Sequence, residues 1–208
     1  MLRIKETNSE GGNVKSGKKE IMITKFFVLW FKLKGWKIQG TVSADIKKAV
    51  VIAAPHTSNW DFIYALAVFK MLGMKVNYLA KKELFRFPLS ILLKNTGGMP
   101  VERSKKQSLT DQIIKKFNQT DNLFVAIPAE GTRKLVVKWK SGFYYAALGA
   151  NVPVLPGYLD YKNKLAGFGE PIFLTGNKEV DMPKFKAFYQ DKTGKNAELF
   201  NVECITLE

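Results

Sequence analysis

Apolar and polar positions alternate along this chain in blocks that are typical of a layered α/β protein. Short runs with almost no polar residue, such as AVVIAA, LFVAI and VPVLPGY, indicate buried strands. Between them we predict helices from about Asn59 to Leu72, closed by Gly73 in the left-handed region, and from Gln107 to Asn118. These alternating elements predict an α/β fold with a mostly parallel or mixed central sheet flanked by helices.

The remaining signals continue the same alternation. Further strands are expected at GWKIQGTV, VNYLA and GMPV, further helices at LSILLKN and FYYAALGA, and a late hairpin around KNKLAGFG. A chain of 208 residues with 46% hydrophobic content fits one folded domain better than two. We therefore interpret residues 1–19 as a polar flexible tail, 20–35 as an amphipathic helix and 36–208 as a single α/β domain.

The predicted helix over residues 20–35 is open to two interpretations. Lys18, Lys25 and Lys32 recur every seven residues and form one narrow stripe, whereas almost everything else there is apolar or aromatic. Such a helix either packs onto the core of the domain or lies in a lipid interface with its lysines reaching towards headgroups. The longest uninterrupted apolar runs, FIYALAVF and FFVLWF, are far shorter than the roughly 18–20 residues that a membrane-crossing helix needs.

The charge of the chain narrows the class of partner. There are 33 Lys and Arg against 18 Asp and Glu, which gives a net charge of +15. This excess favours nucleic acid, anionic lipid or phosphorylated substrates. The sequence has no zinc-finger spacing, RNP-like aromatic strand or recognisable helix-turn-helix, so we expect an anionic membrane surface and no nucleic acid. With one histidine and one cysteine, Cys204, no metal-ligand cluster or internal disulfide is expected.

The single histidine, His56, follows the predicted strand AVVIAA in the turn that leads into the next helix. Ser58 to Asp61 fits the capping-box pattern, which alone would explain the acidic residue. Alternatively, the chain folds back so that the Asp61 carboxylate accepts the proton of one ring nitrogen and leaves the other nitrogen as a base. The competing interpretation is a lone, hydrogen-bonded and inert histidine in a turn.

Three more segments follow the histidine in order. They are GGMPVERS, which holds Arg103, IPAEGTRK, which holds Glu130, Gly131, Thr132 and Arg133, and NVPVLPG. Together with His56 and Asp61, they resemble the four sequence blocks of the glycerophosphate and lysophosphatidate acyltransferase family, over about half of the chain. The chain departs from the family pattern next to the chemistry-bearing positions: Pro55 replaces a common Asn, and Lys134 replaces the Ser of the Glu-Gly-Thr-Arg-Ser block.

The resemblance implies a role for each matched residue. His56 would be the general base that takes a proton from a glycerol hydroxyl, and Asp61 would orient it. Arg103 and the block from Glu130 to Arg133 would bind the glycerophosphate acceptor, which agrees with the planar fork of arginine and the close approach that glycine allows. Taken singly, each arginine is more simply explained as a solvated surface charge, and Gly131 as an ordinary turn.

The function predicted on this basis is an O-acyltransferase of membrane lipid synthesis. It would move a fatty acyl group from acyl-CoA or acyl carrier protein to a lysophospholipid or glycerophosphate hydroxyl, with no cofactor beyond the thioester co-substrate. The altered neighbours of the blocks leave open another acceptor, such as a lyso-ornithine lipid, and a basic nucleic-acid-binding domain is the remote alternative. The polar N-terminus has no apolar core of a signal peptide, so we expect a peripheral location on the cytoplasmic side of a membrane.

Overall fold

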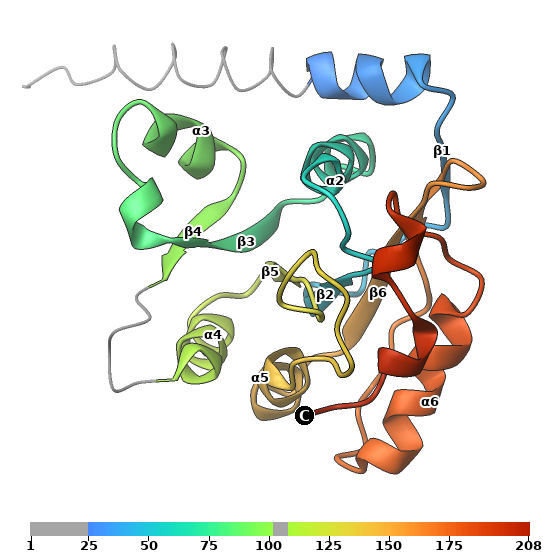
Figure 1. Cartoon of the computed structure of the whole chain (residues 1–208). Coiled ribbons are helices and arrows are strands. Elements are labelled where there is room, and N and C mark those ends of the chain that lie inside the picture. The colour runs from blue at the N-terminus through green and yellow to red at the C-terminus, as the bar shows by residue number, and fades with distance from the viewer. Residues whose placement is uncertain (1–24, 102–107) are drawn as a thin grey trace, which may run out of the picture.

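A mixed sheet forms the centre of the protein in the computed structural model, which describes residues 25–101 and 108–208. Its strands are β1 (Lys37–Gln39), β2 (Lys48–Ala53), β3 (Val76–Lys81), β4 (Gly98–Val101), β5 (Leu123–Ile127), β6 (Val154–Asp160) and β7 (Leu165–Phe168). They lie in the order β1-β7-β6-β2-β5-β3-β4 (Figure 1). Neighbouring strands are parallel except for the antiparallel pair β6 and β7. The tail predicted over residues 1–19 lies outside the described residues.

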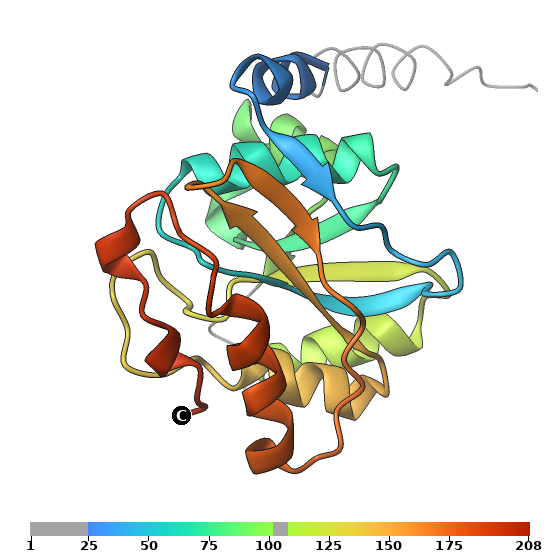
Figure 2. The ribbon, with the colours of Figure 1, turned by 90° about the vertical axis from the view of Figure 1, so that its right-hand side faces the viewer.

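Helices cover both faces of this sheet (Figures 1 and 2). One face carries α2 (Trp60–Met71), α3 (Leu89–Asn95) and a helix over residues 25–33. The other carries α4 (Leu109–Asn118), α5 (Gly142–Ala150) and α6 (Lys178–Tyr189). Single turns of 3-10 helix follow at η1 (Lys82–Leu84), η2 (Ala197–Leu199) and η3 (Val202–Cys204). A mixed sheet between two layers of helices confirms the fold class predicted from the sequence.

Strand β2 shows why its sequence has almost no polar position. Val50 and Ile52 belong to the core shared with α4, α5 and α6, whereas Ala49 and Val51 belong to the core shared with α2. Successive side chains of a strand point to opposite faces, so a strand covered on both sides needs apolar residues at every position. Its parallel neighbours β5 and β6 keep β2 in the interior of the sheet.

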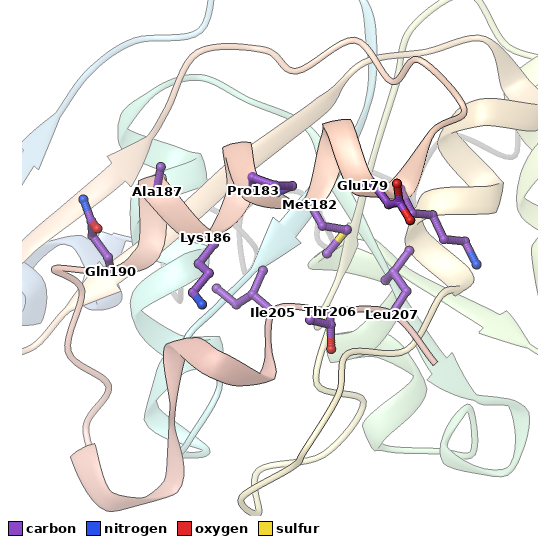
Figure 3. Close-up of a pocket in the computed structure, with 10 residues that line it drawn as sticks. Glu179, Met182, Pro183, Lys186, Ala187, Gln190, Ile205, Thr206 and Leu207 are labelled. Carbon is purple, nitrogen blue, oxygen red and sulfur yellow. The ribbon is translucent and has the colours of Figure 1, made fainter.

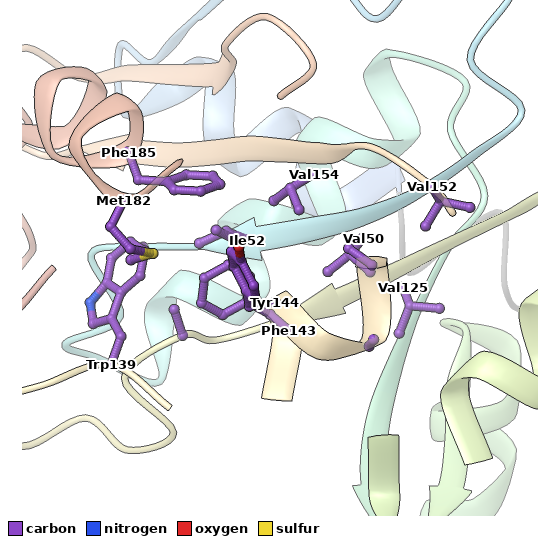
Figure 4. Packing of buried hydrophobic residues seen from close by; sticks show 14 of the residues in the cluster. Val50, Ile52, Val125, Trp139, Phe143, Tyr144, Val152, Val154, Met182 and Phe185 are labelled. Atoms are coloured by element: carbon purple, nitrogen blue, oxygen red, sulfur yellow. The ribbon is translucent and has the colours of Figure 1, made fainter. Parts of the chain in front are cut away.

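The core on the side of α5 and α6 also anchors the long loop between β5 and α5. Phe143 packs edge-on against Trp139 and Phe185, with ring centroids 5.8 Å apart in both pairs (Figure 4). All three side chains are fully buried. The backbone N–H of Trp139 donates to the carbonyl of Thr206 at 2.8 Å. The end of the loop is therefore fixed both to the core and to the C-terminal segment.

The helix over residues 25–33 packs on α2 through one of its sides. Phe31 is fully buried and lies edge-on to Tyr64 at 6.0 Å, and Trp30 stacks on Trp60 at 6.0 Å. The core-packing interpretation therefore holds for this side of the helix, while the first residues of the range predicted for it lie outside the described part of the chain. Within residues 25–101 and 108–208, no helix combines the length and the apolar character needed to cross a bilayer.

Most predicted elements lie within a few residues of their expected positions. The antiparallel pair β6 and β7 confirms the late hairpin, and Gly73 closes α2 with φ of +67°. Helix α6, however, was not predicted. It contains Pro183 in its interior, where proline removes a backbone donor and normally ends a helix. Met182 and Tyr189, on the same face, are buried in the core, and this tertiary burial stabilises a helix that local propensity disfavours.

Candidate active site

Three neighbouring parallel strands end at the same edge of the sheet. His56 follows β2 by three residues, Glu130 follows β5 by three residues, and Tyr161 follows β6 directly. Strand β2 pairs in parallel with both β5 and β6, so their carboxyl ends lie side by side. In open α/β sheets, ligands bind in the crevice outside the carboxyl ends of the strands. The topology therefore gathers these three residues at the edge where a site is expected.

His56 and Asp61 face each other across the turn after β2. Nδ1 of His56 lies 3.3 Å from Oδ2 of Asp61, and 16% and 6% of the two side chains are exposed. The same Oδ2 accepts the backbone N–H groups of Thr57 at 2.9 Å and of Ser58 at 2.8 Å. The turn therefore wraps around the carboxylate. It brings together two side chains that would point apart at this spacing on a continuous helix.

The start of α2 differs in detail from the predicted capping box. The helix begins at Trp60, and Asn59 occupies the cap position without a side-chain cap bond. Ser58 Oγ accepts the N–H of Trp60 at 3.2 Å, whereas the carboxylate of Asp61 reaches back to the N–H of Ser58. The acidic residue thus supports the start of the helix and contacts the histidine at the same time.

The second oxygen of Asp61 binds a residue that the sequence did not indicate. The hydroxyl of Tyr161 donates to Oδ1 of Asp61 at 2.7 Å. Burial, reinforced by the negative charge of Asp61, raises the pKa of Tyr161 well above its ordinary value of 10.0. The hydroxyl therefore stays protonated and acts as a donor. Both carboxylate oxygens of Asp61 therefore accept hydrogen bonds, and the residue is only 5% exposed.

Glu130 contacts the turn between β2 and α2, residues 54–59, which we call the histidine turn. It is 2% exposed. Its Oε1 accepts the backbone N–H of His56 at 2.9 Å, a contact between residues 74 positions apart. Its Oε2 is buried without a hydrogen-bond partner among the described residues. Burial raises the pKa of Glu130 to about 7, against the opposing effect of the bond from His56. The structure therefore places this carboxyl group against the backbone of the turn.

Gly131, Thr132 and Arg133 lie beyond Glu130 on an exposed part of the same loop. Gly131 has φ of +68°, and a Cβ there would lie 3.0 Å from Cγ of Lys140, so the position suits glycine. The side chains of Thr132 and Arg133 are exposed to solvent. The structure thus groups Glu130 with the histidine and aspartate, and leaves the three following residues open to a ligand.

Arg103 is outside the described residues. Within residues 25–101 and 108–208, no group of three or more His, Cys, Asp or Glu side chains is arranged to hold a metal ion. A groove of about 560 Å³ runs between α6 and residues 205–207 (Figure 3). None of the predicted site residues lines this groove, so it does not belong to the site around His56.

Sequence reasoning missed two residues that contact the histidine turn. Tyr161 binds Asp61, and Asn196 donates from Nδ2 to the carbonyl of Thr57 at 2.9 Å and from its backbone N–H to Thr57 Oγ1 at 3.1 Å. A signal for Tyr161 was present, because it lies three residues after the predicted buried strand VPVLPGY, and the carboxyl ends of such strands converge. Asn196 offered no comparable signal, because 139 positions separate it from Thr57.

Comparisons with known proteins found a matching family model and a similar solved structure. Residues 36–160 match a family model described as Acyltransferase. The structure is similar to the crystal structure of the 1-acyl-sn-glycerophosphate (LPA) acyltransferase PlsC from Thermotoga maritima. The TM-score is 0.53 at 19% sequence identity, over 85% of this chain and 78% of that chain, and at this identity the likeness shows the fold alone. A search of curated proteins gave no significant match.

Proposed function

Because the chain belongs to the acyltransferase family, we propose that it transfers a fatty acyl group from a thioester, acyl-CoA or acyl carrier protein, to a hydroxyl group of a lysophospholipid or glycerophosphate. The 3.3 Å contact between His56 Nδ1 and Asp61 Oδ2 is the observation that carries the proposal. The structurally similar protein from Thermotoga maritima is a 1-acyl-sn-glycerophosphate acyltransferase, which supports this class of acceptor.

The proposed chemistry follows from the orientation of the ring. Asp61 holds the proton on Nδ1 of His56, and Nε2 has no protein partner within the described residues, so it is free to act as a base. Nε2 takes the proton of the acceptor hydroxyl while the oxygen attacks the thioester carbonyl. The carbon–sulfur bond then breaks, and the imidazolium returns the proton to the leaving thiolate. Asp61 stabilises the imidazolium between these two steps.

The acceptor would bind where the exposed loop after Glu130 meets this edge of the sheet. Arg133 supplies a planar guanidinium, and it is exposed to solvent together with Gly131 and Thr132. Arg103 is proposed as a further phosphate ligand on the basis of the family resemblance. A lyso-ornithine lipid is the alternative acceptor, because the residues that flank the matched blocks differ from the usual pattern.

Peripheral binding to an anionic membrane on its cytoplasmic side is the proposed location. Phe26, Leu29 and Leu33, which share one face of the helix over residues 25–33, are 62%, 56% and 73% exposed. Large apolar side chains are also exposed around α3, and both regions lie at the same end of the molecule (Figures 1 and 2). These are Leu84, Phe87, Leu89, Ile91 and Leu92. Exposed apolar residues on a basic protein fit the interface of an anionic bilayer.

An acceptor screen with the purified protein tests the proposed reaction. Lysophosphatidate, glycerophosphate and a lyso-ornithine lipid would each be incubated with acyl-CoA and with acyl carrier protein thioester, and the products identified by mass spectrometry. With the preferred pair, His56→Ala should lose at least about a hundredfold in turnover, because a positioned base contributes about 10²–10⁴. Circular dichroism checks that the variant is folded. Wild-type turnover in a folded His56→Ala protein would exclude the assignment of the base.

A further inference from the structure

Asp61 is held by donors from two separate parts of the chain. Oδ2 receives the backbone N–H groups of Thr57 and Ser58 and lies near the ring of His56. Within the described residues, Oδ1 receives a hydrogen bond from the hydroxyl of Tyr161 alone, at 2.7 Å. Without that hydroxyl, one oxygen of a buried carboxylate would have no partner, and an unpaired buried acceptor tends to turn towards water. The orientation of the carboxylate therefore depends on Tyr161 as well as on the two backbone donors.

Tyr161 is itself firmly placed. Its ring lies edge-on to Trp36 at 4.9 Å and to Tyr64 at 5.8 Å, with an interplanar angle of 90° in both pairs. Its backbone N–H donates to the carbonyl of Thr193 at 2.9 Å. A ring held on two sides and at its backbone delivers the hydroxyl to one point at little cost in side-chain entropy.

The segment that binds Tyr161 also touches the histidine turn. Next to Thr193, a Cβ on Gly194 would lie 2.8 Å from Oγ1 of Thr57 and 3.2 Å from Cβ of Pro55. Asn196 donates two hydrogen bonds to Thr57. The C-terminal part of the chain therefore packs directly against the turn that carries the proposed base, although it lies beyond the matched family region of 36–160.

We propose that Tyr161 is a positioning residue for acyl transfer: its hydroxyl holds Oδ1 of Asp61 so that Oδ2 stays directed at Nδ1 of His56. This inference rests on the proposed function, because it requires His56 to act as the base. Tyr161 does not contact the reacting atoms itself. It acts through Asp61, and its effect therefore appears in the chemical step rather than in the binding of either substrate.

The substitution Tyr161→Phe tests this inference, because it removes the hydroxyl and keeps the ring that packs on Trp36 and Tyr64. We expect kcat to fall about tenfold or more, with KM for acceptor and donor unchanged, since misorientation of a catalytic group slows the chemical step. Tyr158→Phe is the matched control. Tyr158 lies on the same strand end, and its hydroxyl binds Gln39 Oε1 at 3.1 Å, away from Asp61. An unchanged kcat in Tyr161→Phe, or an equal loss in the control, would overturn the inference.

A double-mutant cycle shows whether Tyr161 acts through the carboxylate. In an Asp61→Asn background, Tyr161→Phe should have almost no further effect on kcat, because the carboxylate that it orients is already absent. Independent, multiplying losses would contradict the proposed route. Failure of this inference is separable from failure of the proposed function. An inactive His56→Ala beside a fully active Tyr161→Phe removes only the role of Tyr161, whereas an active His56→Ala removes the base assignment itself.

Discussion

The backbone N–H of His56 donates to Oε1 of Glu130 over 2.9 Å. The histidine turn is thereby tied to the loop after β5 on one side, as it is tied to α2 through Asp61 on the other. Because Glu130 is 2% exposed, its contacts favour a role in holding the turn. Binding of the acceptor, the role implied by the family resemblance, stays a prediction for this residue, and the two roles give different results on substitution.

Two substitutions distinguish whether Glu130 holds the histidine turn or binds the acceptor. Glu130→Gln keeps an oxygen that accepts the N–H of His56, so turnover should stay within about threefold of wild type, whereas Glu130→Ala should lose about tenfold to a hundredfold in kcat because the turn is released. Steady-state kinetics with varied acceptor measure both. If Glu130→Gln instead raises KM for the acceptor as strongly as Glu130→Ala does, the carboxylate itself contacts the acceptor.

The same carboxyl group makes stability depend on pH. Burial raises the pKa of Glu130 from 4.5 to about 7, so between these values the folded state holds a proton that the unfolded state releases. The protonated carboxyl group of Glu130 therefore stabilises the folded state fully below about pH 4.5. This stabilisation, on the order of 3 kcal/mol, is lost as the pH rises through about 7.

Glu130→Gln cannot ionise and should therefore gain in free energy of unfolding relative to wild type between about pH 5 and about pH 8. Urea denaturation of both proteins across this range measures the difference in their free energies of unfolding. All other titrating groups are common to the two proteins, so their effects cancel in this difference. A difference that does not change with pH would contradict the raised pKa.

Asp61→Asn should lower kcat by about a hundredfold or more, because the amide no longer stabilises the imidazolium. Asparagine keeps one oxygen that can accept the backbone N–H groups of Thr57 and Ser58, so the start of α2 should lose only about 1 kcal/mol. Comparing kcat with the free energy of unfolding separates the two roles. A loss of stability with unchanged kcat would leave Asp61 as a helix cap alone.

Arg133→Ala should raise KM for a phosphate-bearing acceptor about tenfold or more, since a charge-assisted bond to an anion is lost. KM for the acyl donor should be almost unchanged. The control is Lys47→Ala, which removes one exposed charge just before β2, at the opposite end of that strand from His56. If the donor KM rises instead, Arg133 contacts the anionic groups of the thioester carrier.

The triple variant Phe26→Ser, Leu29→Ser and Leu33→Ser should bind anionic vesicles at least about tenfold more weakly, because three exposed apolar side chains are removed from the proposed interface. Point changes are preferable to deletion of the helix, since Phe31 is fully buried in the core. Phe173→Ser is the control, because Phe173 is 65% exposed in the loop between β7 and α6. Equal pelleting of wild type, triple variant and control with phosphatidylglycerol vesicles would exclude this face from membrane binding.

The sequence itself determined most of the architecture. Central strands such as β2 are covered on both faces, so their runs of apolar residues are unmistakable, and the positions of Gly73 and the hairpin follow from local backbone preferences. The order of the matched blocks identified the family to which the chain belongs. It also singled out His56, Asp61 and Glu130, which are close in sequence to the ends of buried strands.

Only the tertiary structure decided how these residues are supported. Helix α6 forms despite the proline in its interior, because its apolar face packs into the core. No local pattern of the sequence reveals this packing. The bonds from Tyr161 to Asp61 and from Asn196 to Thr57 join positions 100 and 139 residues apart. The local sequence shows which chemical group a residue carries and which helix or strand begins or ends near it. Which distant donor satisfies a buried carboxylate depends on packing, because such contacts form only when separate elements meet at one edge of the sheet.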